Sequence, residues 1–416
     1  MKILDYLDEH LFREIDTNDY SLVIKSITLS TTSEIPIEVN STQLCKGLNA
    51  DMIDGIYAHE VVLSDGSVKM TNNLDMGNHK ITNVKDPIDD HDIVNLKTVI
   101  KYLNPQPGND SIISGGYYSG GGYYTSRIDK VDISVLSDST DFGHLLAKNC
   151  FSSSCSNGIN NRGIIAGGSE TCNANERTNV IQYVDVTIMS DAMDFGDLLE
   201  NNAKCAATSN GSDNRGIFMG GLISNVSTIS YINISNTSNA LAFGDTVTFV
   251  ADAEGTSNGK NGYGIVACGE SSNGQPTNTI QYVNINTLSD SINFGESTLE
   301  RRGITACSND QYNRAIFMGG CSYGASTKYN VIDYVDITIP ANANDFGDLM
   351  YKLYNSASTS NGKNNRGMYY GGRNQNGTTI VLIQYININI SSNANNFGNI
   401  NDYFGTNHSS TSNGKL

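Results

Sequence analysis

The sequence predicts an all-β protein in which residues 109–416 form a six-bladed β-propeller. Three observations predict it: one unit recurs six times, each unit holds four strand-like segments, and the first and last copies are incomplete in complementary ways. An apolar run ending in glycine marks each unit. Its last glycine stands at 116, 168, 221, 269, 320 and 372, which gives a period of 48–53 residues. Four short strands fit this period, and four strands make one propeller blade.

The strand-like segments can be assigned in each copy. The second is the apolar run itself, and the third alternates apolar and polar residues with the period of two that is typical of strands, as in residues 181–186. A Phe-Gly pair marks the fourth, with its phenylalanine at Phe142, Phe195, Phe243, Phe294, Phe346 and Phe397. The first ends in Ser-Asn, usually followed by glycine. Since Asn and Gly adopt positive φ at low cost, this segment predicts a tight hairpin to the second strand.

The phase of the copies predicts a closed ring. The first copy begins at its second strand, near Asp110, with no Ser-Asn-Gly strand before it. The chain ends on Ser412, Asn413 and Gly414 with no second strand after them. Pairing the two ends completes the first blade and leaves no unpaired inner edge, whereas an open stack would leave two.

The order of these segments is similar to that of kelch repeats: an inner strand, an apolar strand ending in Gly-Gly, a third strand bearing tyrosine and a fourth bearing an aromatic residue. Phenylalanine stands where kelch blades usually place tryptophan, and the chain has no tryptophan. The resemblance implies a kelch-like propeller and covers about three quarters of the chain.

The N-terminal part carries no repeat. Residues 48–55 and 74–87 resemble segments of bacteriophage tail fibre proteins, and propeller repeats of this kind are similar to those of phage virion proteins. The resemblance implies a virion-attachment region at 1–47, a fibre shaft with a short helix and linker at 48–108, and a homotrimer. Residues 75–92 are also too sparse in apolar side chains to form a core alone, which favours strands shared between chains, with a merely extended linker as the alternative. The apolar spacing of residues 3–12 indicates a helix.

Charge and cysteine usage exclude several classes of function. A net charge of −17 repels phosphate backbones and anionic membrane surfaces, so no nucleic acid and no membrane insertion are expected. No apolar stretch has the length of a spanning helix or a secretion signal. Cys155 and Cys307 stand where other copies have threonine, so the eight cysteines are expected to be small buried thiols rather than disulfides.

No catalytic apparatus, cofactor or metal site is expected. Sialidase-type Asp boxes need tryptophan, and a copper oxidase needs more histidines than the two of the propeller, His144 and His408. The glycine-rich stretch 115–122 lacks the lysine of a phosphate loop. Acidic turns such as 190–194 are expected to be ordinary Asx turns rather than calcium sites.

The loops after the second and fourth strands are expected to share one face of the ring. Blades five, six and one, which become neighbours when the ring closes, place aromatic and amide side chains there. Tyrosine offers an apolar face with a polar tip, which suits sugars or a polar protein surface, although some of these tyrosines could equally be packing residues. The candidate receptor-binding residues are Tyr117, Tyr118, Tyr123, Tyr124, Tyr323, Tyr351, Tyr354, Arg373, Asn374, Gln375, Tyr403 and Phe404.

Together these features lead us to expect a phage virion fibre protein, a tail fibre or similar, that displays the propeller for recognition of a host-surface glycan or protein. Such a protein is assembled in the host cytoplasm, is exposed on the particle surface and contacts other virion proteins through its N-terminal region. A purely architectural capsid or tail decoration fibre without a receptor is the first alternative. A glycan-processing enzyme on the same scaffold is the second.

Overall fold

The computed structural model describes residues 109–412 except 119–121, 157, 159, 174, 210–213, 223–226, 260–261, 310–312, 362–364 and 402–403, together with the backbone of four short N-terminal strands. Those strands are β1 (Lys2–Leu7), β2 (Leu11–Asp16), β3 (Met52–Ile53) and β4 (Ile56–Tyr57). The helix indicated for residues 3–12 is wrong, because β1 and β2 pair as an antiparallel hairpin. The described residues do not include the rest of the predicted attachment region and shaft, with their boundaries at 47 and 108. They also do not include Tyr403, Asn413 and Gly414.

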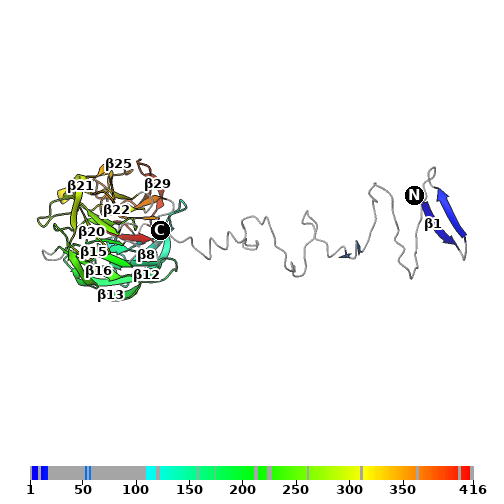
Figure 1. Cartoon of the computed structure of the whole chain (residues 1–416), viewed down its shortest axis with the longest axis horizontal. Coiled ribbons are helices and arrows are strands. Elements are labelled where there is room, and N and C mark those ends of the chain that lie inside the picture. Colours follow the sequence, from blue (N-terminus) through cyan, green and yellow to red (C-terminus); the bar gives the residue numbers. More distant parts are fainter. Residues whose placement is uncertain are drawn as a thin grey trace. The chain divides into compact units, whose positions relative to one another are not determined.

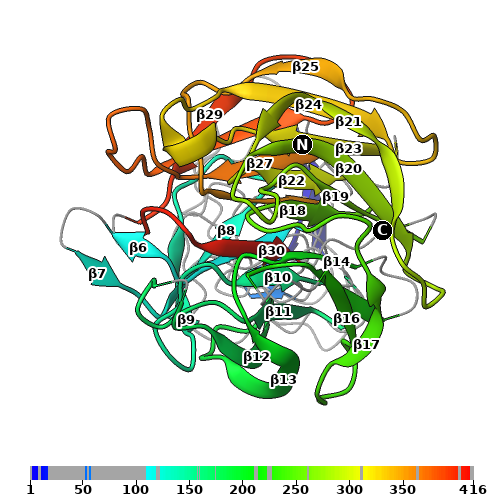
Figure 2. The same cartoon turned by 90° about the vertical axis from the view of Figure 1, so that its left-hand side faces the viewer.

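The chain from Asp110 forms six four-stranded antiparallel sheets arranged as the blades of a β-propeller (Figure 1). Blades two to four are β10 (Ser153–Cys155), β11 (Arg162–Ala166), β12 (Thr178–Asp185), β13 (Met193–Asn202); β14 (Ala206–Ser209), β15 (Arg215–Met219), β16 (Thr228–Asn233), β17 (Leu241–Asp245); and β18 (Glu254–Thr256), β19 (Tyr263–Ala267), β20 (Thr277–Asn284), β21 (Ile292–Arg301). Blades five and six are β22 (Thr305–Ser308), β23 (Arg314–Met318), β24 (Val331–Asp336), β25 (Asn344–Asp348); and β26 (Ala357–Asn361), β27 (Arg366–Tyr370), β28 (Leu382–Asn387), β29 (Asn395–Asn399). In Figure 2, strands such as β10, β14 and β30 lie near the middle of the ring and β13, β17 and β25 at its rim. No helix in the described part of the chain could span a membrane.

Blade one confirms the predicted closure. Its sheet has the order β30 (Ser409–Ser412), β5 (Asp110–Ser114), β8 (Arg127–Asp132) and β9 (Thr140–His144). The C-terminal strand pairs antiparallel with β5 from Ser409↔Ser114 to Ser412↔Ser111. The last strand of the sequence therefore supplies the inner strand that the first repeat lacks.

The core lies between blades, with one buried apolar cluster at each of the six joints of the described propeller. In blades two to six the Phe-Gly phenylalanine packs edge-on against the third-strand tyrosine of its own blade, as Phe195 does with Tyr183 at 5.9 Å between ring centroids. The glycine that follows is required by the next blade: a Cβ on Gly143 would lie 2.3 Å from the carbonyl oxygen of Ser190. The Phe-Gly pair thus fills a core and admits a neighbouring backbone.

The arginine of the Asn-Arg-Gly segment also joins blades. Arg162 lies over the ring of Tyr183 and donates from its guanidinium to the Ile234 carbonyl of the next blade at 2.9 Å. Arg366 of blade six makes the equivalent bond to Ile133 of blade one at 2.6 Å. The motif is therefore explained by packing between blades.

The cysteines of the described propeller follow the prediction except for one pair, and Cys45 lies outside the described residues. Cys155 and Cys307 occupy the inner-strand position held elsewhere by threonine, opposite Ile164 and Ile316 respectively. They are buried free thiols, as are Cys205, Cys268 and Cys321. Cys150 and Cys172, in contrast, form a disulfide, with their Cα atoms 5.1 Å apart. The expectation of reduced thiols fails for this pair because the two residues, 22 positions apart, are brought together in blade two only by folding.

Candidate functional site

The loops after the second and fourth strands meet on one face of the propeller, which we call the Gly-Gly face. In blade two, Cys150, which precedes the inner strand, forms a β-bridge with Ser169, which follows the Gly-Gly pair. Blade six repeats the bridge between Tyr354 and Arg373. Both sets of loops are therefore anchored to one another at the same end of the blades.

Blade one contributes a tyrosine hairpin to this face. Strands β6 (Tyr117–Tyr118) and β7 (Tyr123–Tyr124) pair with each other, and in Figure 2 they project beyond the blades. The rings of Tyr117 and Tyr124 lie 5.5 Å apart and are half-buried. Tyr117 also bridges to Thr406, which precedes the closing strand. The hairpin is thereby attached to the linker that enters from blade six.

Blade five presents the most exposed tyrosines of the predicted set. Tyr323, in the one-turn 3₁₀ helix η2 (Tyr323–Ala325), is 58% exposed, and Tyr351 is 49% exposed. Tyr354 is half-buried, with the Lys328 ammonium group 5.3 Å from its ring centroid. Only Tyr323 and Tyr351 therefore offer broad free rings among the described candidates.

The polar candidates of blade six hold the loops together. Arg373 donates from Nε to the Gly377 carbonyl at 2.8 Å. Asn374 accepts the backbone N–H groups of residues 376 and 378 in an Asx turn. Gln375 reaches blade five, where it accepts the N–H of Lys328 and donates to Ser326. These groups are engaged in intramolecular bonds, which is a cost for any receptor that would recruit them.

Phe404 is not part of the face. It is fully buried in the apolar cluster between blades six and one and packs against the ring of His408. The prediction that Phe404 is a contact residue is wrong, because the linker to the closing strand turns this side chain inward. The backbone of Tyr118 and Tyr123 is described above, and their side chains are outside the described atoms.

A ring of backbone hydrogen bonds joins the six blades on the Gly-Gly face. The N–H of each member donates to the carbonyl of the member in the preceding blade, at 2.8–3.1 Å. Every member has φ between 53° and 60°. The six residues are Phe151, Lys204, Asp252, Gly303, Asn355 and Asn407. Because blade one's Asn407 accepts from blade two's Phe151, the ring closes around the axis and fixes the bases of the loops.

The inner strands below this ring carry small side chains and one carboxyl group. Serine hydroxyls cross from blade to blade, as from Ser412 to the Ser360 carbonyl at 2.7 Å. Glu254 is the carboxylate among these strands, and desolvation raises its pKa to about 8. This group is therefore mainly protonated at neutral pH.

The described residues bring together no cluster of three or more His, Cys, Asp or Glu side chains able to hold a metal ion. His144 is exposed beside Asp191, whereas His408 is buried with Nε2 2.9 Å from the Tyr370 carbonyl. Burial raises the pKa of the Cys155 and Cys307 thiols to about 12, which makes them poor nucleophiles. The turn at 190–194 uses Asp191 to accept the His144 N–H of the preceding blade.

One feature was missed from the sequence: a pocket between blades two and three. It is lined by Leu198, Leu199, Glu200, Asn202, Phe218, Thr228 and Ser230. The sequence signal for this pocket is the residue just before the third-strand tyrosine, or before Lys130 in blade one. This residue is Gln, Asp or Ser in the six blades: Asp129, Gln182, Ser230, Gln281, Asp333 and Gln384. Ser230 is the shortest of the six.

No protein-family model matches the chain, and no curated protein matches it significantly.

Proposed function

We propose that this chain is a virion fibre protein of a tailed bacteriophage whose propeller recognises the host surface through its Gly-Gly face. The observation that carries the proposal is the pair of exposed rings, Tyr323 and Tyr351, on a face whose loops are joined by hydrogen bonds between blades five and six and by the bridge from Tyr117 of blade one to Thr406. Rigid aromatic side chains lose little entropy on binding and suit sugar or polar protein surfaces. The resemblance of the N-terminal segments to tail fibre proteins supports the same assignment.

In this proposal the N-terminal region attaches to other virion proteins and the shaft trimerises, so that three propellers are displayed on the particle surface. The propeller acts as a binding module and not as an enzyme. Light scattering on the full chain should give the mass of a trimer. A monomer would contradict the shaft assignment while leaving the recognition face untouched.

The test of recognition is adsorption to host cells. Replacing Tyr323 and Tyr351 together by alanine should weaken binding by about 1–3 kcal/mol, with the melting temperature unchanged because both rings are exposed. A matched control replaces Ile188 and Ile339, which are each 60% exposed in turns between third and fourth strands at the opposite end of the blades. Unchanged adsorption of the tyrosine variant, or an equal loss in the control, would reject this face as the receptor site.

A purely architectural decoration role is the second candidate. The observation that favours it is the engagement of Arg373 and Gln375 in bonds between loops, which stiffens the face without leaving these groups for a ligand. Virions lacking the protein would then adsorb normally but lose particle stability. A glycan-processing activity would instead appear as release of saccharide from host polysaccharide by the purified protein, and we expect none.

A further inference from the structure

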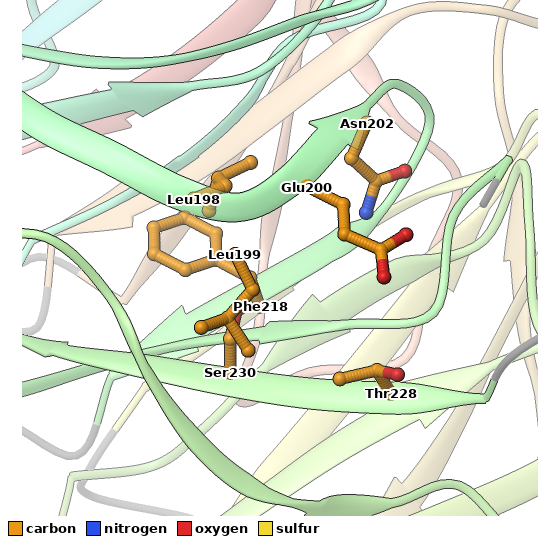
Figure 3. Close-up of a pocket in the computed structure, with 7 residues that line it drawn as sticks. All are labelled: Leu198, Leu199, Glu200, Asn202, Phe218, Thr228 and Ser230. Carbon is orange, nitrogen blue, oxygen red and sulfur yellow. The ribbon is translucent and has the colours of Figure 1, made fainter.

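The pocket between blades two and three has a definite origin in the repeat. It lies between the end of β13 and the third strand β16, with Leu198 and Phe218 at its apolar side and Glu200, Asn202, Thr228 and Ser230 contributing polar groups (Figure 3). Its cavity volume is about 50 Å³, and the space continues into solvent. The other joint that follows a long fourth strand is that between blades four and five, after β21.

At the joint of blades four and five, an arginine fills the corresponding space. Arg301 is fully buried, and its guanidinium donates to the carbonyl groups of Gly319 and Val331 at 2.9 Å. The same guanidinium forms a buried ion pair with Asp333. Asp333 in turn accepts the backbone N–H of Thr298 at 3.0 Å.

The repeat makes the two joints directly comparable. Asn202 follows its Phe-Gly phenylalanine by the same number of residues as Arg301, and Ser230 precedes its tyrosine as Asp333 does. Phe218 and Thr228 correspond likewise to Phe317 and Val331, whose carbonyl groups surround the Arg301 guanidinium. The pocket is therefore the space that a guanidinium group occupies at the other joint, left open because Asn202 and Ser230 are both shorter.

Asn202 does not fill this space, because its amide is held against blade three. The side chain is 6% exposed and donates from Nδ2 to the Gly220 carbonyl at 2.8 Å. Its buried Oδ1 lies beside Gly221, where an added Cβ would come within 2.1 Å of this oxygen. The equivalent Asn149 at the joint of blades one and two is held in the same way, with its Oδ1 accepting the Ser169 N–H at 3.0 Å. The amide therefore stays at the end of the pocket and leaves the rest of the space open.

The carboxylate of Glu200 at the rim of the pocket favours a positively charged hydrogen-bond donor. Glu200 is exposed, and Figure 3 shows its carboxylate extending over Thr228 beside the Asn202 amide. The pocket thus combines an apolar side with oxygen acceptors and one carboxylate. This is the set of groups that a planar cation with several N–H donors requires.

We propose that this pocket binds a guanidinium group, supplied either by an arginine side chain of a partner protein or by a small guanidino compound. The bound group takes the place that Arg301 holds at the joint of blades four and five, with Glu200 as its counter-ion. This site is independent of the receptor face proposed above, because it lies on other blades and uses none of the same residues.

Titration calorimetry on the full chain tests the proposal with two probes, agmatine and the peptide acetyl-Gly-Arg-Gly-amide. Binding of agmatine alone assigns the site to a small compound, and binding of the peptide assigns it to an arginine side chain. The neutral analogue butylurea should bind at least tenfold more weakly. Binding of neither cation, or equal binding of butylurea, would overturn the proposal.

Two paired variants locate the binding in the pocket. Asn202→Arg with Ser230→Asp rebuilds the internal ion pair and should abolish binding. Arg301→Asn with Asp333→Ser opens the equivalent space, where Leu299 stands in place of Glu200, and should add a second, weaker site. Should either pair fail to fold, Glu200→Gln keeps the test, because this exposed residue can change without harm to the fold and should weaken agmatine binding about threefold. Agmatine binding that persists unchanged in the first pair or in Glu200→Gln would place it elsewhere and refute the site.

Discussion

The backbone N–H of Asn399 in blade six donates to Oδ1 of Asp138 in blade one at 2.7 Å. This bond is the closing copy of a contact that each blade makes with the next, immediately after its Phe-Gly pair. The other donor and acceptor pairs are His144 to Asp191, Asp197 to Asn239, Asp245 to Asp290, Glu296 to Asn342 and Asp348 to Asn393. The joint between the last and first blades is thus built like the other five.

We predict that Asp138→Ala destabilises the protein by about 1 kcal/mol, because it removes the acceptor at the closing joint. The matched variant is Asp191→Ala, which removes the same acceptor between blades one and two. Chemical denaturation should give equal losses for the two. A loss of stability for Asp191→Ala alone would show that the hydrogen bond at the closing joint does not stabilise the protein.

We predict that removing residues 409–416 opens the ring. The deletion takes away β30 and exposes the edge and apolar face of β5, so we expect aggregation or a large fall in melting temperature. Removing only residues 413–416 keeps all pairs between β30 and β5 and should change the melting temperature far less. If both truncated proteins melt like the full chain, closure by the C-terminal strand is not what stabilises the propeller.

Gly398→Ala should cost about 2–3 kcal/mol, since its added Cβ would lie 2.2 Å from the Ser137 carbonyl oxygen of blade one. The φ angle of Gly398 is not in the left-handed region, so the expected loss of stability comes from steric contact between the blades and not from backbone strain. Gly274→Ala is the control: Gly274 has φ of +76° but nothing within 4 Å of an added Cβ, and it should cost only about 1 kcal/mol. Equal losses in denaturation experiments would argue against close approach of the blades.

The buried His408 should make stability fall in mild acid. Desolvation lowers its pKa from 6.5 to about 4, so between these values the unfolded chain binds a proton that the folded chain does not. Stability is therefore fully present above pH 6.5 and is lost as the pH falls toward 4, by about 3 kcal/mol in all. His408→Gln should lack this part of the pH dependence. Denaturation of both proteins across this range gives the difference, and parallel curves would contradict the assignment.

The disulfide predicts redox-dependent stability in blade two. Cys172→Ser should cost about 3 kcal/mol under oxidising conditions, because the Cys150–Cys172 bond closes a loop with a sequence separation of 22, and little with reductant present. Cys155→Thr is the control, since threonine occupies the same inner position in other blades. A loss for Cys172→Ser that does not depend on reductant would exclude the bond as its cause.

The sequence by itself determined the number of blades, the role of each strand and the closure of the ring. It could do so because these properties follow from local patterns: period-two alternation sets the strand faces, Ser-Asn-Gly sets the hairpin, and the phase at Asp110 and Ser412 sets which ends must pair. The alternation of Cys155 with threonine likewise identified an inner-strand position, which the register of β10 confirms.

Only the tertiary structure decided which side chains are free to act. Phe404 is buried, Arg373 is bonded within its own loop, and Cys150 meets Cys172, none of which is visible in the repeat. The pocket beside Asn202 and Ser230 arises because two short side chains from different blades face one space that Arg301 and Asp333 fill elsewhere. Burial and pairing depend on groups that only folding brings together, within one blade or between two. A local sequence pattern identifies a strand but not the side chains that pack against it.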